Sequence, residues 1–349
     1  MVDKRQARRT AIDLFCGAGG LTLGLKQAGF EVLWAVDNNP LAIETYEKNH
    51  PNVETELEDI SLLDADDVRC TLGLEMNQLD LLAGCPPCQG FSTIRTLNGS
   101  KEIEDERNDL VFEFLDFVRA FRPKAMMLEN VPGLMDDARL DSFEKDLRSL
   151  GYDPEAKKLN AAKYGTAQRR RRMILLAGKH GPVPWPKPDE TGLTVADKIR
   201  DLPPIGNSGD ALHDVPERRT DRIMHLIKKI PEDGGSRTDL PREEWLECHK
   251  KCDGFKDVYG RMAWEEVAPT ITSGCVNPSK GRFLHPEEHR AITLREAALL
   301  QGFPEDYWFS LERGKYAAAR MIGNALPPPL IERLACSVYD YLSSTPKGF

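Results

Sequence analysis

Cys88 is the residue of this sequence that is best placed to act as a nucleophile. It follows an apolar run over residues 79–85, which has the composition of a buried parallel strand. Pro86 and Pro87 fix their own φ angles and donate no backbone hydrogen bonds, so they form a stiff exit from that strand. Open α/β sheets bind ligands beyond the carboxyl ends of their strands. The sequence therefore predicts a cysteine at a reactive edge.

Three interpretations of Cys88 are open on this segment alone. Most intracellular cysteines are small buried thiols that only fill space. Cys85 and Cys88 also form a C-x-x-C pair, which occurs in redox sites and as half of a zinc site. The third interpretation makes Cys88 a catalytic nucleophile, and the rest of the chain must discriminate among the three.

Other side chains suited to chemistry follow or precede other predicted strands. Glu129 ends the buried strand expected over 124–131, and the cluster 168–172, Gln-Arg-Arg-Arg-Arg, leads into a strand over 172–177. The simplest interpretation makes Glu129 a turn ligand and the arginines a solvated surface. A nucleophile, a carboxyl group and cations converging on one sheet edge instead indicate an active site.

The N-terminal segment has the pattern of a nucleoside-binding βαβ unit. A strand over 10–16 runs into a glycine turn at 17–20, then a helix that stops at Gly29, then a strand over 31–37 that ends in Asp37. The glycines let the backbone approach a ligand, and the carboxylate accepts ribose hydroxyls. This pattern does not choose between a nicotinamide dinucleotide and S-adenosylmethionine.

The order of elements predicts a doubly wound, Rossmann-like α/β domain followed by a smaller loop-rich domain. Helices are expected from Pro40 and over 108–121 and 138–150, between the predicted strands. Residues 181–188 then form a proline-rich connector of the kind that marks a domain boundary. Beyond it the periodicity weakens and turns multiply, and helical pattern returns after residue 293.

Composition limits the classes of protein that fit. The chain has 349 residues, a net charge of −9 and eight cysteines without disulfide-like spacing, which favours a reducing cytoplasm. No apolar run approaches the length of a membrane span, so we expect no membrane partner. The acidic balance argues against binding nucleic acid through bulk positive charge, although a local basic cleft is compatible with it.

Six ordered segments carry a resemblance that covers residues 10 to 330. The sequence resembles the bacterial type of C5-cytosine DNA methyltransferase, with a loop-rich segment in the place of that family's target-recognition domain. Cys85 is a small departure, since the family more often has glycine or a bulky apolar residue there. The matching segments are Asp13-Leu-Phe-Cys-Gly-Ala-Gly-Gly20, Pro86-Pro-Cys-Gln-Gly-Phe-Ser92, Glu129-Asn-Val131, Gln168-Arg-Arg-Arg-Arg172, residues 290–304 and Gly323-Asn-Ala-Leu-Pro327.

The resemblance implies an enzyme that transfers a methyl group from S-adenosylmethionine to carbon 5 of a flipped-out cytosine in a specific duplex DNA sequence. It implies a catalytic domain over 1–185, completed by 305–349, and a target-recognition domain and hinge over 186–304. We expect a cytoplasmic monomer that serves restriction-modification or epigenetic marking, with a cognate restriction endonuclease as a partner. No metal is expected, although Cys248, His249 and Cys252 offer a zinc alternative.

The same resemblance assigns the catalytic roles. Cys88 supplies a thiolate that adds to carbon 6 and turns the ring into an enamine that is nucleophilic at carbon 5. Glu129, in its protonated form, holds ring N3, and Arg172 holds the carbonyl oxygen of the base. Arg170 completes the catalytic set by supporting a loop or a phosphate.

The resemblance also assigns binding residues. Phe15 is expected against the adenine or the sulfonium, Asp37 on the ribose and Asn324 at the methionine end. The full expected cofactor set is Phe15, Gly17, Gly19, Asp37, Asn38, Asp59, Ile60, Pro87 and Asn324. The residues expected to contact DNA are Gln89, Ser92, Arg261 and Thr270, with Arg261 as the reader of a guanine.

Three other functions would each explain part of the sequence. The transfer-RNA-methylating branch of the same family shares the catalytic segments but has a different target module. A nicotinamide-dependent oxidoreductase would explain the βαβ unit but not the proline-cysteine or arginine segments. A protein that only binds would normally lack the nucleophile, which this chain retains.

Overall fold

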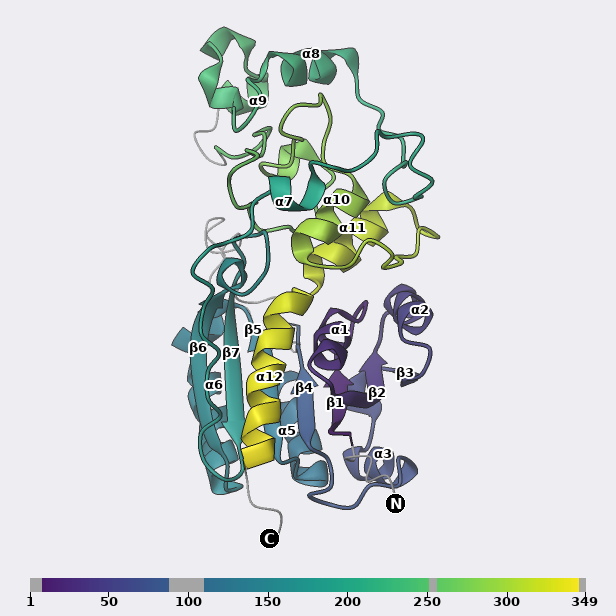
Figure 1. The fold of residues 1–349 in the computed structure, drawn as a ribbon, viewed down its shortest axis with the longest axis vertical. Helices are drawn as coiled ribbons and strands as arrows, with labels where there is room; N and C mark the ends of the chain where they lie inside the picture. Colours follow the sequence, from purple (N-terminus) through teal and green to yellow (C-terminus); the bar gives the residue numbers. More distant parts are fainter. Residues whose placement is uncertain (1–7, 88–109, 251–255, 345–349) are drawn as a thin grey trace, which may run out of the picture. The chain divides into compact units, whose positions relative to one another are not determined.

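The computed structural model describes residues 8–87, 110–250 and 256–344, and its chain forms two compact units (Figure 1). The first unit consists of Met1–Asn160, Arg171–Pro188 and Pro328–Phe349, and the second of Ala161–Arg170 and Asp189–Pro327. The expected domains differ from these units, because residues 161–170 and 305–327 belong to the second unit by their contacts.

A seven-stranded sheet forms the centre of the first unit, in the order β3-β2-β1-β4-β5-β7-β6. The strands β1 to β5 run parallel, whereas β7 is antiparallel to β5 and β6 is antiparallel to β7. The strands are β1 (Thr10–Leu14), β2 (Glu31–Asp37), β3 (Glu54–Leu57), β4 (Leu81–Gly84), β5 (Ala125–Asn130), β6 (Asp153–Asn160) and β7 (Arg171–Gly178).

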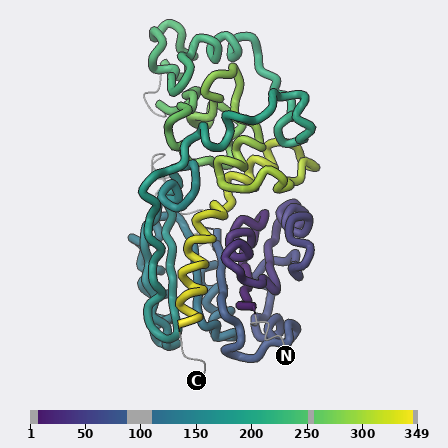
Figure 2. The backbone as a smooth tube through the Cα atoms, in the orientation of Figure 1, coloured from purple at the N-terminus to yellow at the C-terminus, as the bar shows by residue number. Residues whose placement is uncertain are grey.

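Helices cover both faces of the sheet. In one layer α1 contacts α2 and α12, and Figure 2 shows α12, from the end of the chain, beside α1 near its start. In the other layer α5 contacts α3 and α6. The helices are α1 (Gly20–Gln27), α2 (Pro40–Asn49), α3 (Ala65–Thr71), α5 (Leu110–Phe121), α6 (Ala138–Ser149) and α12 (Pro328–Ser344).

Alternate side chains of β1 contact the two helix layers on opposite faces of the sheet. Ile12 and Leu14 are fully buried in the apolar core on the α5 side, with Phe114 and Phe117. Asp13 has the opposite orientation, as every second residue of a strand must, and accepts a hydrogen bond from Thr22 of α1 at 2.7 Å. The strand therefore joins an apolar layer to a layer that contains buried polar groups.

The second unit has more loops and shorter helices, which suits its turn-rich sequence. Its helix α10 begins with a capping box, in which Thr293 and Glu296 satisfy each other's backbone amides. Its helices are α7 (Ala196–Ile199), α8 (Asp221–Lys229), α9 (Glu247–Lys250), α10 (Leu294–Gln301) and α11 (Lys315–Asn324). No helix in the described ranges is long and apolar enough to cross a membrane.

The α/β architecture expected from the sequence is confirmed, and several predicted elements appear within a few residues of their expected bounds. The predicted strand over 31–37 matches β2, and α2 begins at Pro40 with Asn39 as its N-cap, as expected. The antiparallel direction of β7 was not predicted. It determines how the candidate site is assembled.

Candidate active site

Glu129 and Arg172 meet because β7 runs antiparallel to β5. Glu129 lies near the carboxyl end of β5, opposite Ile174, and Arg172 lies near the start of β7. Because β7 is antiparallel, its first residues, including Arg172, lie at the edge of the sheet where the parallel strand β5 ends. Arg172 Nε lies 2.7 Å from Glu129 Oε1, and the Glu129 side chain is only 10% exposed. The structure brings these two predicted catalytic residues together.

The segment that leads to Cys88 is held by Asn130. The side-chain amide of Asn130 donates to the Pro86 carbonyl at 3.2 Å, while its own oxygen accepts from the Val131 amide at 2.8 Å. No role is predicted for Asn130 from the sequence, although it directly follows Glu129 at the end of a predicted strand. Cys88, Gln89 and Ser92 lie outside the described residues.

Gly84 ends β4 where two strands press closely together. A Cβ atom at this position would lie 2.8 Å from the Leu14 carbonyl oxygen and 3.1 Å from Phe114. Only glycine fits this approach without displacing backbone. The end of β4 is therefore tightly packed against Leu14 and Phe114. The Cys85 amide continues the strand pairing by donating to the Leu14 carbonyl at 3.2 Å.

The segment 168–172 alternates between buried and exposed residues. Gln168 and Arg170 are buried, whereas Arg169 and Arg171 are exposed. Such alternation is typical of an extended chain. As a result, the neighbouring arginines of this segment lie in different environments, buried or exposed to solvent. The chain passes from the second unit to the first between Arg170 and Arg171, and Arg172 of the first unit pairs with Glu129.

Arg170, which was expected to support a loop or a phosphate, supports a turn within the second unit. Its Nη1 donates to the Ile271 and Gly323 carbonyls, both at 3.0 Å, and its Nη2 donates to the Asn324 carbonyl at 3.3 Å. The Arg170 guanidinium is buried, and its hydrogen bonds hold the turn that carries Asn324, a residue that was predicted to bind the cofactor. The other residues that were predicted to bind the cofactor belong to the first unit.

The Asn324 turn is further defined by close packing and by two glutamines. A Cβ atom on Gly323 would lie 2.2 Å from the Thr272 carbonyl carbon, so position 323 requires glycine. Gln168 accepts the Ile271 amide at 2.8 Å and donates to Gln301, which in turn donates to the Ala325 carbonyl. Buried amides that are satisfied in this way fix a unique backbone arrangement.

The glycine turn after β1 has the backbone expected of a ligand-binding loop. Phe15, Gly17 and Gly19 all have positive φ, at 61°, 53° and 89°. Phe15 is a strained exception among them, because a residue with a Cβ rarely adopts this conformation. A Cβ atom on Gly17 would meet nothing within 4 Å, so open space lies beside the turn.

Asp37 joins this turn to the end of β2. One of its carboxylate oxygens accepts the Gly17 amide and the other accepts the Asn39 amide, each at 2.9 Å. Burial raises the pKa of Asp37, while these two hydrogen bonds oppose that shift. Each oxygen retains acceptor capacity, because a carboxylate oxygen has two lone pairs.

Asn38 and Asp59 bring the ends of β2 and β3 together. The Asn38 amide donates to Asp59 Oδ2 at 3.3 Å, and Asp59 Oδ1 accepts from the Ser61 amide and hydroxyl. The hydrogen bonds from Ser61 are the main reason that the pKa of Asp59 lies below its usual value. Ile60 is buried next to it, whereas Pro87 is exposed. A left-handed turn, two carboxylates and open space fit an adenosine-containing cofactor.

Comparison with known proteins decides the family. The family model for C-5 cytosine-specific DNA methylases matches residues 9–340. The chain belongs to this family. It is 38% identical over 347 residues to the Type II methylase M.HgiDII of Herpetosiphon aurantiacus, and the match covers 95% of each chain. It is 33% identical to the Type II methyltransferase M1.HphI of Haemophilus parahaemolyticus, with 94% of this chain and 86% of that one covered.

A solved structure agrees with the family assignment. A prophage-encoded Escherichia coli protein, provisionally described as a DNA modification methyltransferase, superposes with a TM-score of 0.70 at 27% identity. The match covers 96% of this chain and all of that one. As a member of the C-5 cytosine-specific DNA methylase family, this chain has the Rossmann-like α/β fold that its seven-stranded sheet displays.

Arg261 of this methylase has an environment that does not suit the base-reading role expected for it. The guanidinium is buried and donates to the carbonyls of Ile227, Ile230, His285 and Glu288 and to His289 Nδ1, at distances of 2.5–3.2 Å. An arginine has five N–H donors, and these contacts occupy every nitrogen. Two of the carbonyls come from the carboxyl end of α8 and its cap, so Arg261 anchors that helix.

Thr270, the other residue of the second unit expected to contact DNA, is half-buried. Its hydroxyl donates to the Arg169 carbonyl at 2.5 Å. The donated hydrogen is therefore used within the protein, and only the acceptor lone pairs of the oxygen can serve a ligand.

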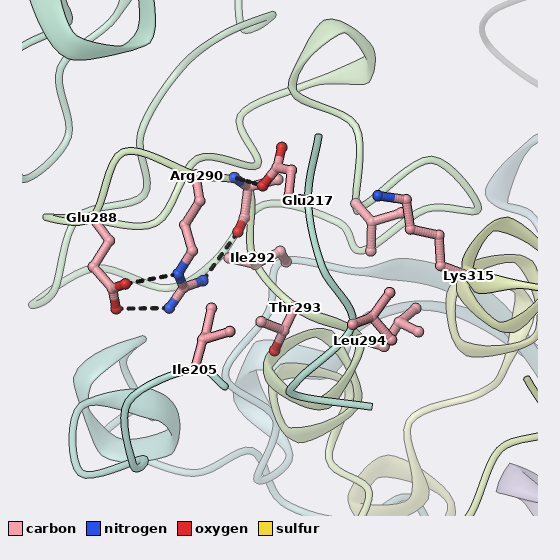
Figure 3. Close-up of a pocket in the computed structure, with 11 residues that line it drawn as sticks. Ile205, Glu217, Glu288, Arg290, Ile292, Thr293, Leu294 and Lys315 are labelled. Atoms are coloured by element: carbon pink, nitrogen blue, oxygen red, sulfur yellow. Dashed lines mark hydrogen bonds and ion pairs between the residues drawn. The ribbon is translucent and has the colours of Figure 1, made fainter. Parts of the chain in front are cut away.

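A pocket of about 220 Å³ lies in the second unit of this methylase (Figure 3). Ile205, Ile292 and Leu294 line it, with the charged side chains of Arg290 and Lys315 near them. Arg290 pairs with Glu288 and Glu296 and is neutralised by them. No residue expected at the active site lines this pocket. Among the described residues, no group of three or more histidine, cysteine or acidic side chains is arranged to hold a metal ion.

Proposed function

We propose that this methylase modifies carbon 5 of a cytosine within a specific duplex DNA sequence, as the modification enzyme of a Type II restriction-modification system. The single observation that carries the proposal is the Glu129–Arg172 pair at the carboxyl edge of the sheet, beside the segment leading to Cys88. The names of the two relatives above support the Type II assignment, and with it a cognate endonuclease as a partner.

S-adenosylmethionine, when bound, supplies a methyl group on a positively charged sulfur. Asp37 is proposed to accept the ribose hydroxyls, and Asn38 and Asp59 to face the adenine with Ile60. Phe15, Gly17 and Gly19 are proposed to form the turn around the cofactor, with Pro87 beside it and Asn324 at the methionine end. The fit rests on the open space beside Gly17 and on the acceptor capacity of the two carboxylates.

Cys88 is proposed as the nucleophile that makes carbon 5 reactive. Its thiolate adds to carbon 6 of the ring, and the displaced π electrons give an enamine whose carbon 5 is nucleophilic. Once carbon 5 is methylated, loss of its proton and of the Cys88 sulfur restores the aromatic ring. The ring is out of reach inside a duplex, so the base must flip out, at a cost of a few kcal/mol of stacking.

Glu129 and Arg172 are proposed to hold the flipped base. Glu129, in its protonated form, is proposed to hold ring N3 of the cytosine, while its Oε1 accepts from Arg172 Nε. Arg172 uses Nε for Glu129 and Nη1 for the Arg171 carbonyl, at 2.7 Å. We assign Nη2 to the carbonyl oxygen of the base, where negative charge develops.

Sequence recognition is proposed for residues 186–304, most of which belong to the second unit. The loops of this segment are suited to entering a DNA groove, and its sequence is the part expected in the place of a target-recognition domain. Chemistry is proposed for the first unit, which holds Glu129 and Arg172.

Bisulfite sequencing of DNA from a host that expresses the protein tests the proposal. We expect protected cytosines at one position of one short sequence, and none with the Cys88→Ser variant. Purified protein is then supplied with isotopically labelled S-adenosylmethionine and either duplex DNA or transfer RNA. Label transferred to transfer RNA alone would replace this proposal with the transfer-RNA-methylating function.

A further inference from the structure

The carbonyl of Gly19 is held by a residue far away in the sequence. Gly19 is the left-handed N-cap of α1, and its carbonyl accepts the Leu23 amide at 2.9 Å within that helix. The same oxygen lies 3.2 Å from Nε2 of His50, the C-cap residue of α2. His50 is only 2% exposed, so this contact lies inside the layer formed by α1 and α2.

Lys26 determines which tautomer of His50 is present. Its Nζ lies 3.3 Å from His50 Nδ1. An ammonium group only donates hydrogen bonds, so Nδ1 must accept. The ring hydrogen is then on Nε2, and Nε2 donates to the Gly19 carbonyl. Burial, aided by the charge of Lys26, lowers the pKa of His50 to about 4, so the ring stays neutral at physiological pH.

The surroundings of His50 hold its ring in place. Tyr46 packs edge-on against it, with ring centroids 4.8 Å apart. The Tyr46 hydroxyl lies 2.7 Å from the Thr22 hydroxyl, which donates to Asp13 of β1 at 2.7 Å. The glycine turn is thus supported from β1, from α1 and from α2.

We propose that His50 is a positioning residue for S-adenosylmethionine binding, and that Lys26 acts through it by fixing its tautomer. The inference rests on the proposed function, in which the turn at residues 15–19 receives the cofactor. The His50 hydrogen bond holds Gly19 in the left-handed conformation before the cofactor arrives. A preformed loop loses less conformational freedom on binding, so affinity rises without a direct contact to the ligand.

Calorimetric titration with S-adenosylmethionine and with S-adenosylhomocysteine tests this role. One net hydrogen bond contributes ~0.5–1.5 kcal/mol, so His50→Leu should weaken both affinities by about 3- to 10-fold. His50→Gln supplies an amide donor near the Nε2 position and should restore binding to within about 3-fold. Lys26→Met should give an intermediate loss. At saturating cofactor, the turnover of all three variants should equal that of the unmodified protein.

The exposed residues His180 and Lys48 provide matched controls, and His180→Leu and Lys48→Met should bind as the unmodified protein does. Melting temperature, recorded for each variant, identifies any loss caused by unfolding. A folded His50→Leu variant with unchanged affinity would overturn the inference, and so would a folded His50→Gln variant as weak as His50→Leu. Absence of binding by the unmodified protein would instead refute the proposed function.

Discussion

Arg172 and Glu129 are joined by a 2.7 Å ion pair although 42 positions separate them in sequence, and the antiparallel β5–β7 pairing produces this contact. A parallel β7 would put its first residues at the opposite edge of the sheet. The strand order then places the carboxylate of Glu129 on β5, its cation on the neighbouring β7, and the segment that leads to Cys88 after β4 on the other side.

Glu129→Gln should reduce methyl transfer by about 10²–10⁴-fold, because an amide can contact the ring but cannot supply a proton. Its carbonyl oxygen can still accept from Arg172, so the fold should survive. Initial rates with labelled cofactor measure the first effect, and calorimetry should show cofactor affinity within about 3-fold of the original.

Glu144→Gln is the matched control for this prediction. Glu144 pairs with Arg148 on the surface of α6, and its loss should leave the rate unchanged. Full turnover in Glu129→Gln would remove this carboxyl group from the mechanism.

DNA that carries 5-fluorocytosine at the target position should trap the enzyme covalently, because fluorine prevents the final elimination. Cys88→Ser should abolish the adduct on denaturing gels, while Cys85→Ser should retain it. Cys85 lies at the end of β4, where its amide continues the strand pairing. Trapping that is lost with Cys85→Ser and kept with Cys88→Ser would mean that the nucleophile is wrongly assigned.

Asp13→Asn should stabilise the protein more at pH 8 than at pH 5. Burial raises the pKa of Asp13 to about 7, while an unfolded chain has the usual value of 3.8. The folded state therefore binds an extra proton between these values, and stability is lost as pH rises through that window. Denaturant titrations at both pH values should show the advantage of the variant growing by about 2–3 kcal/mol. An advantage that is equal at both pH values would contradict the assignment of this proton to Asp13.

Arg261→Met should lower the free energy of unfolding by about 3 kcal/mol or more, because it leaves buried carbonyls at the end of α8 without a donor. Arg218→Met, at an exposed position before α8, should have little effect. Urea denaturation measures both. If instead Arg261→Met keeps its stability and loses preference at one base of the methylated sequence, Arg261 reads DNA after all.

The central strands could be predicted from sequence and the edge strands could not. β2 and β5 are apolar runs, since both faces of a central strand are buried, and they lie where predicted. β3 and β6 form the two edges of the sheet, and their sequences, ETEL and DPEAKKLN, carry charges throughout. An edge strand in solvent needs no apolar run, so the pattern gave no signal.

The types of the site residues could be predicted, but the environments of the arginines could not. An arginine in a polar segment is normally a surface residue, and Arg170 and Arg261 are buried. Most of their acceptors are backbone carbonyls, from segments as far away as Asn324 for Arg170. Such contacts exist only after the chain has folded, and no local pattern encodes them.

The packing of α12 on α1 determines when the first unit can be completed during synthesis. Gly24 of α1 lies so close to α12 that a Cβ there would be 2.6 Å from Ile331 Cβ, and Arg9 donates to the Leu342 carbonyl at 2.6 Å. α12 is translated roughly 300 residues after α1, a delay of ~15–60 s at ordinary rates. During that interval the surface of α1 that α12 will cover is exposed. Circular permutation that moves α12 ahead of β1 would remove the delay.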